Sequence, residues 1–191
     1  MEVSRFSLSE LEDYLIPQVL KPMQILTTAI GFAPVMFLLI IVILFLNSEP
    51  GSGGYASRIV LILSLANIVV WLSIGMVSKF LFNKMMKTSF DDLQSFPPLR
   101  KKQLNEQSVL IEKFLGNTKN ALIIRFALME GSALIGLIAV LFAVLEGSII
   151  SNPVYWINLF SFLSFIFTLV RFYPSKEYFI NTYNELLTDG F

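Results

Sequence analysis

Four long runs of apolar residues organise this chain. They are Met23 to Leu46, Ile59 to Ser78, Ala121 to Leu145 and Val154 to Val170. A helix needs about 20 apolar residues to cross a bilayer core that is about 30 Å thick. Inside a bilayer, the backbone of such a segment must satisfy its own hydrogen bonds, and a helix does this. The pattern predicts an all-α integral membrane protein, a bundle of four transmembrane helices.

The polar segments between these runs predict smaller elements. Residues 1–22 are expected to form an amphipathic interfacial segment, with a helix from Ser7 to Leu20 that has Leu8, Leu11, Leu15 and Val19 on one face. Ser7 with Glu10, or Ser9 with Glu12, has capping-box spacing. A frayed tail is the alternative interpretation. Residues 174–191 are expected to form a C-terminal tail.

The central connection, residues 83–119, is predicted to be a basic helical loop. Ser89 with Asp92 can cap a short helix that Pro97-Pro98 would stop. A second helical pattern starts at Leu99. Gly116-Asn117 either breaks this second helix or lets it run into the third span.

The basic residues predict which side of the membrane each segment occupies. The connections 47–57 and 146–153 contain no Lys or Arg, whereas residues 79–119, which include the central connection, contain eight. Basic residues favour the cytoplasmic side. We therefore expect two tandem helical hairpins, residues 23–82 and 120–173, with both termini and the central connection in the cytoplasm. The hairpins resemble each other at an offset of 98 residues, through either duplication or the shared features of membrane hairpins.

The composition excludes several chemistries. Charged residues make up 15% of the chain, against about 25% in a soluble domain. Histidine and cysteine are both missing, which excludes disulfides, His/Cys zinc sites and Ser–His or Cys–His nucleophiles within the chain. Fourteen basic and fourteen acidic residues give no net positive charge for nucleic acid. We expect no enzyme, no catalytic residues, no cofactor and no metal.

Glu130 is the acid that lies well inside a span, and such residues are usually paired or functional. Counting along the antiparallel third and fourth spans places Arg171 within one turn of its level. Arg125 lies five residues earlier, and Lys79 is the counterpart of Arg171 in the first half. The alternatives are an ion pair that locks the bundle, a proton or cation site, and a site for a ligand or lipid headgroup.

Other residues inside the spans are expected to shape the packing. Pro34 predicts a kink in the first span and, less favoured, a broken-helix ion site. Small residues at Gly131, Ser132 and Gly136 favour close helix packing. A set of polar side chains in the second and fourth spans is expected to form interhelical hydrogen bonds: Ser64, Asn67, Ser73, Asn158, Ser161 and Ser164.

Two resemblances follow from particular motifs. Arg125, Ala127, Leu128, Glu130 and Gly131 form R-x-A-L-x-E-G, and Arg171, Pro174, Ser175, Lys176 and Glu177 form R-x-x-P-S-K-E. These segments resemble a group of small uncharacterised bacterial four-span membrane proteins, which implies the bacterial inner membrane and no known activity. Locally, the helix around Glu130 resembles the carboxylate helix of rotary-ATPase proteolipid subunits, which would give Glu130 an ion-carrying role.

Two functions remain from the sequence. The first is a non-enzymatic accessory or structural subunit of a larger membrane assembly. Its expected partners are the lipid bilayer and a membrane protein or further copies of the chain. The second is a proton- or cation-handling transport element centred on Glu130.

Overall fold

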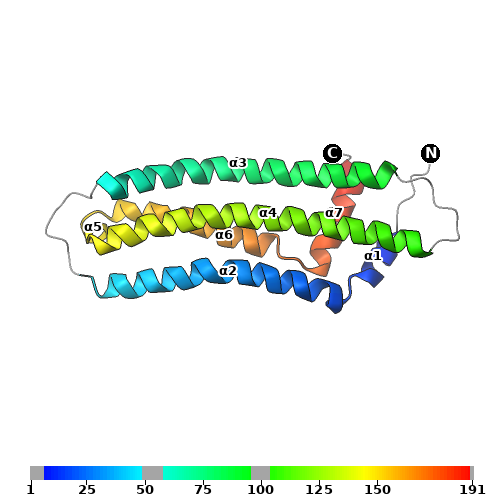
Figure 1. The fold of residues 1–191 in the computed structure, drawn as a ribbon, viewed down its shortest axis with the longest axis horizontal. Coiled ribbons are helices and arrows are strands. Elements are labelled where there is room, and N and C mark those ends of the chain that lie inside the picture. The colour runs from blue at the N-terminus through cyan, green and yellow to red at the C-terminus, as the bar shows by residue number, and fades with distance from the viewer. Residues whose placement is uncertain (1–6, 49–57, 96–103, 190–191) are drawn as a thin grey trace. The chain divides into compact units, whose positions relative to one another are not determined.

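The computed structural model describes residues 7–48, 58–95 and 104–189, with side chains over 7–48, 58–88 and 108–186. The described residues form helices and no strands (Figure 1). In chain order these are α1 (Leu8–Tyr14), α2 (Pro17–Leu46), α3 (Arg58–Ser95), α4 (Leu104–Leu145), α5 (Ser148–Ser151), the 3₁₀ helix η1 (Pro153–Asn158), α6 (Leu159–Arg171) and α7 (Lys176–Asp189).

Four helical segments of the described chain are long and apolar enough to cross a membrane, as the sequence predicted, and the fourth of them combines η1 with α6. They cover Pro17–Leu46, Arg58–Thr88, Ser108–Leu145 and Pro153–Arg171. Half of the apolar stretch of α4 is buried inside the chain, against 11% for α2 and 17% for α3. The chain is therefore a multi-pass membrane protein in which α4 is the most enclosed of the four helices.

The chain divides into two compact units. Unit 1 comprises residues 1–27, 79–125 and 172–191, and unit 2 comprises residues 28–78 and 126–171. Helices α2, α3 and α4 each contribute residues to both units. Unit 2 contains most of the apolar residues of the four spans and also Glu130 and Arg171, whereas the lysines of α3 and α4 all belong to unit 1.

The N-terminal helix is shorter than the sequence predicted. Ser7 caps α1, and both hydrogen bonds of the capping box with Glu10 are present, which confirms that part of the prediction. The helix nevertheless ends at Tyr14, so a single helix from Ser7 to Leu20 is wrong. Pro17 explains the break, because proline restricts the preceding residue and is well suited to begin a helix, here α2.

The central connection is also more helical than predicted. Ser89 lies within α3 and does not start a separate helix, so that prediction is wrong. No glycine or proline occurs between Lys79 and Ser95 to end the helix. Of the two alternatives for Gly116-Asn117, the second is correct, because α4 runs through both residues. Pro97-Pro98 lies outside the described residues.

A tight turn joins α4 to the fourth span. Gly147 has φ 66°, in the left-handed region where glycine carries no steric cost. Ser148 donates a hydrogen bond from its hydroxyl to the Ala143 carbonyl at 3.2 Å. Asn152 then accepts from the Val154 amide and caps η1, which has Pro153 at its first position. The turn brings α6 back alongside α4 in unit 2.

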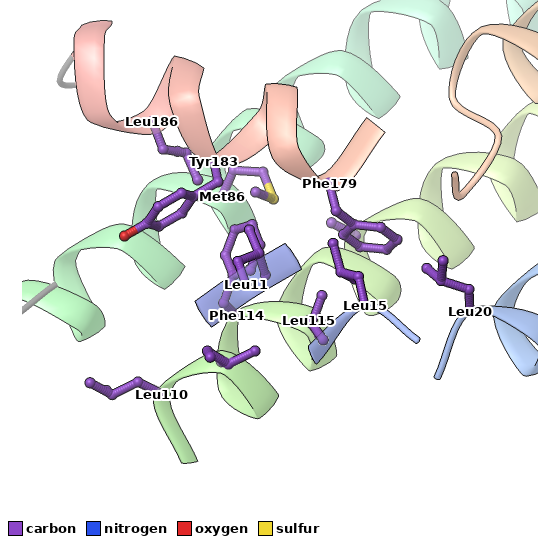
Figure 2. Close-up of a cluster of buried hydrophobic side chains, with 12 residues drawn as sticks. Leu11, Leu15, Leu20, Met86, Leu110, Phe114, Leu115, Phe179, Tyr183 and Leu186 are labelled. Atoms are coloured by element: carbon purple, nitrogen blue, oxygen red, sulfur yellow. The ribbon is translucent and has the colours of Figure 1, made fainter. Parts of the chain in front are cut away.

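Unit 1 has an apolar core to which α1, α2, α3, α4 and α7 contribute residues (Figure 2). Leu11 and Leu15 come from α1, and Phe114 and Leu115 come from α4. The remaining helices contribute Leu20 from α2, Met86 from α3, and Phe179, Tyr183 and Leu186 from α7. The rings of Phe114 and Tyr183 meet edge to face with centroids 5.5 Å apart. This core holds α1 and the C-terminal helix α7 in the same unit.

Candidate functional site

Unit 2 contains a buried cluster of polar side chains between α3 and the start of the fourth span. The Asn67 amide nitrogen donates to Asn158 Oδ1 at 3.0 Å and lies 3.4 Å from the Asn158 carbonyl oxygen. Asn158 in turn donates from its side chain to Ser64 Oγ at 2.9 Å and to the Tyr155 carbonyl at 3.0 Å. We call Ser64, Asn67, Asn158 and Ser161 the asparagine cluster.

Gly136 of α4 packs directly against this cluster. A methyl group built at Gly136 would clash with Ser161 Oγ and the Asn158 carbonyl oxygen and would lie 3.1 Å from the Asn67 amide nitrogen. Helix α4 therefore approaches α3 and the fourth span at a distance that only glycine permits. The predicted close packing of the small-residue strip is confirmed at Gly136, whereas a methyl group at Gly131 would meet nothing within 4 Å.

Further polar contacts run along the same helices. The Trp71 indole nitrogen donates to Ser164 Oγ at 3.0 Å, one turn beyond Asn67 on α3. The predicted interhelical role is therefore confirmed for Ser64, Asn67, Asn158 and Ser164. Ser161 instead donates to the Asn158 carbonyl at 2.9 Å within its own chain segment, and Ser73 is exposed.

Glu130 lies on α4 and is partly exposed in unit 2. Among the described residues of this unit, no ion pair joins Glu130 to a basic side chain. Arg171 ends α6 with an exposed side chain. The ion pair of Glu130 with Arg171 therefore stays a prediction. Lys79 and Arg125 belong to unit 1, where Lys79 is exposed.

Arg125 lies in an aromatic environment that the sequence analysis missed. Its guanidinium carbon is 3.8 Å from the centroid of the Phe172 ring and 5.2 Å from that of Phe82. Phe172 also meets Tyr178 edge to face at 6.1 Å. A guanidinium stacked on aromatic faces gains cation–π attraction of about 0.5–2 kcal/mol. The sequence contains a signal for this environment, because aromatic residues follow the second and fourth spans. These are Phe80 and Phe82 in one half and Phe172 and Tyr173 in the other.

Two tyrosines in unit 1 have perturbed acidity. Tyr14 donates to a Glu112 oxygen at 2.5 Å, and this bond, with burial and the Glu112 charge, raises the pKa of Tyr14 to about 12. Burial raises the pKa of Tyr178 to about 12, against the opposing effects of Thr182 and the Arg125 charge. An exposed ion pair also joins Lys176 to Glu12 at 3.6 Å. These contacts attach α1 and α7 to the unit.

Two further features concern Pro34 and a metal site. Pro34 is buried within α2, which continues through it, and the predicted kink stays a prediction. The described residues include no group of three or more acids that could hold a metal ion.

Comparison with known proteins gives no relative for this chain. No protein family, curated protein or solved structure matches it.

Proposed function

We propose that this protein is a non-enzymatic accessory or structural subunit of a larger assembly in the bacterial inner membrane. One observation carries the proposal: the buried amides of Asn67 and Asn158 bond to each other across the helices. Side chains that bind or carry a solute must exchange partners with it. The Asn67 amide nitrogen and the Asn158 amide oxygen are instead bonded to each other, which fixes the positions of two helices.

The exposed apolar surface supports a role in an assembly. Phe32 and Leu39 of α2, and Val69 and Met76 of α3, each expose half or more of their surface. In a membrane, this surface is covered by lipid or by apolar helices of a partner. An accessory subunit offers such faces to its partner while its interior stays fixed.

Site-specific crosslinking tests the proposal. A photoreactive amino acid is placed at Phe32 or Met76 in the full-length protein in native membranes, with the fully buried Ile41 as the control position. We expect one protein adduct of constant mass at Phe32 or Met76 and none at Ile41. Lipid adducts alone at both exposed positions would contradict an accessory role.

We also propose that both termini and the central connection are cytoplasmic, because the connections 47–57 and 146–153 contain no basic residue. Cysteines at Ser52 and Ser151 should react with an impermeant thiol reagent applied to intact cells, and a cysteine at Ser95 should not. Ser52 lies outside the described residues. Ser151 is exposed, whereas the neighbouring Ser148 is buried and unsuitable. Labelling of Ser95 would reverse the orientation.

A proton- or cation-handling element centred on Glu130 is the second candidate. It is favoured by the absence of an ion pair at Glu130 among the described residues of unit 2. Purified protein in liposomes distinguishes the two functions. A proton or sodium flux that is lost in Glu130→Gln and kept in the matched control Glu146→Gln, at the end of the same span, would establish transport. No flux above empty liposomes would favour the structural role.

A further inference from the structure

Among the described residues of unit 2, two buried side-chain atoms have no hydrogen-bond partner: Asn67 Oδ1 and Ser132 Oγ. Asn67 is 2% exposed and Ser132 is 0% exposed. A buried polar atom without a partner costs about 1–3 kcal/mol. A bound group that satisfied both atoms would remove both costs.

Contacts between α3 and α4 bracket the position of Ser132. Gly136 of α4 faces the amide of Asn67, and Met129 of α4 lies with its sulfur 3.9 Å from Ser78 Oγ of α3. Ser132 lies on α4 between these two contact points. It is also one helical turn before Gly136, and residues four apart share a face of a helix.

The chemistry of the two atoms limits what can bind. The Asn67 amide nitrogen already donates to Asn158, so the free atom is the carbonyl oxygen, and its partner must be a donor. The Ser132 hydroxyl can donate or accept. An anion would be repelled by the carbonyl oxygen. Ca²⁺ or Mg²⁺ would require six or more oxygen ligands, commonly with carboxylates among them, and the asparagine cluster contains no carboxylate.

We propose that an ordered water molecule is bound between α3 and α4, donating to Asn67 Oδ1 and hydrogen-bonded to the Ser132 hydroxyl. Buried waters typically make about three hydrogen bonds to groups that are otherwise unsatisfied. This water extends the asparagine cluster to α4, which contributes Gly136 to the cluster but no side-chain hydrogen bond of its own. This water site is compatible with either of the two proposed functions.

Proton-detected solid-state NMR of the full chain in lipid bilayers tests the proposal through magnetisation transfer from water. We expect short-time transfer from water to the Asn67 side-chain amide and to Ser132 in the wild-type protein. Ala133, which is fully buried and apolar, gives the background. Transfer at Asn67 and Ser132 no greater than at Ala133 would overturn the proposal.

Two variants distinguish one bound water molecule from general access of solvent to the asparagine cluster. Ser132→Ala removes one of the two partners and should abolish the transfer to the Asn67 amide. Ser161→Ala removes a hydroxyl that already bonds to the Asn158 carbonyl, and the transfer should persist. Equal loss in both variants would overturn the proposal, as would a direct bond from the Ser132 hydroxyl to the Leu128 carbonyl in the wild-type protein. The wild-type measurement decides the question even where a variant fails to fold.

Discussion

Replacing Gly136 by alanine tests whether the asparagine cluster holds unit 2 together. The added methyl group would clash with Ser161 Oγ and the Asn158 carbonyl oxygen and would lie 3.1 Å from the Asn67 amide nitrogen. Overpacking costs about 1–3 kcal/mol, and displacing a buried hydrogen bond adds about 1–3 kcal/mol. We therefore expect Gly136→Ala to lower the free energy of unfolding by about 2–6 kcal/mol.

The measurement is reversible unfolding in mixed detergent micelles, followed by circular dichroism. Gly131→Ala is the matched control on the same helix, because its methyl group would meet nothing within 4 Å. It should be neutral or stabilising by less than about 1 kcal/mol. Ser161→Ala in the Gly136→Ala background should recover part of the loss, since it removes one of the clashing atoms. Equal stability of Gly136→Ala and Gly131→Ala would refute the close approach of the helices.

Three further predictions concern unit 1. Arg125→Lys should destabilise the protein by about 0.5–2 kcal/mol, because an ammonium cannot stack on Phe172 as a guanidinium does. A double-mutant cycle with Phe172→Leu should show coupling between the two residues, and additive effects would argue against the stack. The free energy of unfolding should fall as the pH rises from about 10, where tyrosine ionises in the unfolded chain, towards about 12, the pKa of Tyr14 in the folded chain, because only the unfolded chain loses the proton in this range. Denaturation at several pH values should show a shallower fall in Tyr14→Phe than in Tyr173→Phe, which removes an exposed tyrosine as the control. Leu11→Ala should cost about 2–5 kcal/mol and release α1 to protease, whereas Leu8→Ala, at the exposed start of the same helix, should not.

The sequence by itself determined the helices that cross the membrane. Apolar runs of about 20 residues have one stable backbone structure in a bilayer, because each helix satisfies its own hydrogen bonds. The same local reasoning found the Ser7–Glu10 capping box, which depends on residues three apart. It overlooked Pro17 as a helix start, although that signal is also local.

Only the tertiary structure decided which side chains meet. Asn67 and Asn158 are 91 residues apart, and their hydrogen bond depends on the rotation of each helix about its axis, which an all-round apolar run does not specify. Arg125 shows the same limit. Counting residues along the spans predicted Arg125 close to Glu130, whereas in the structure the Arg125 guanidinium stacks on Phe172. Length and hydropathy fix the depth of a residue in the membrane, but contacts between residues distant in sequence arise only when the helices pack.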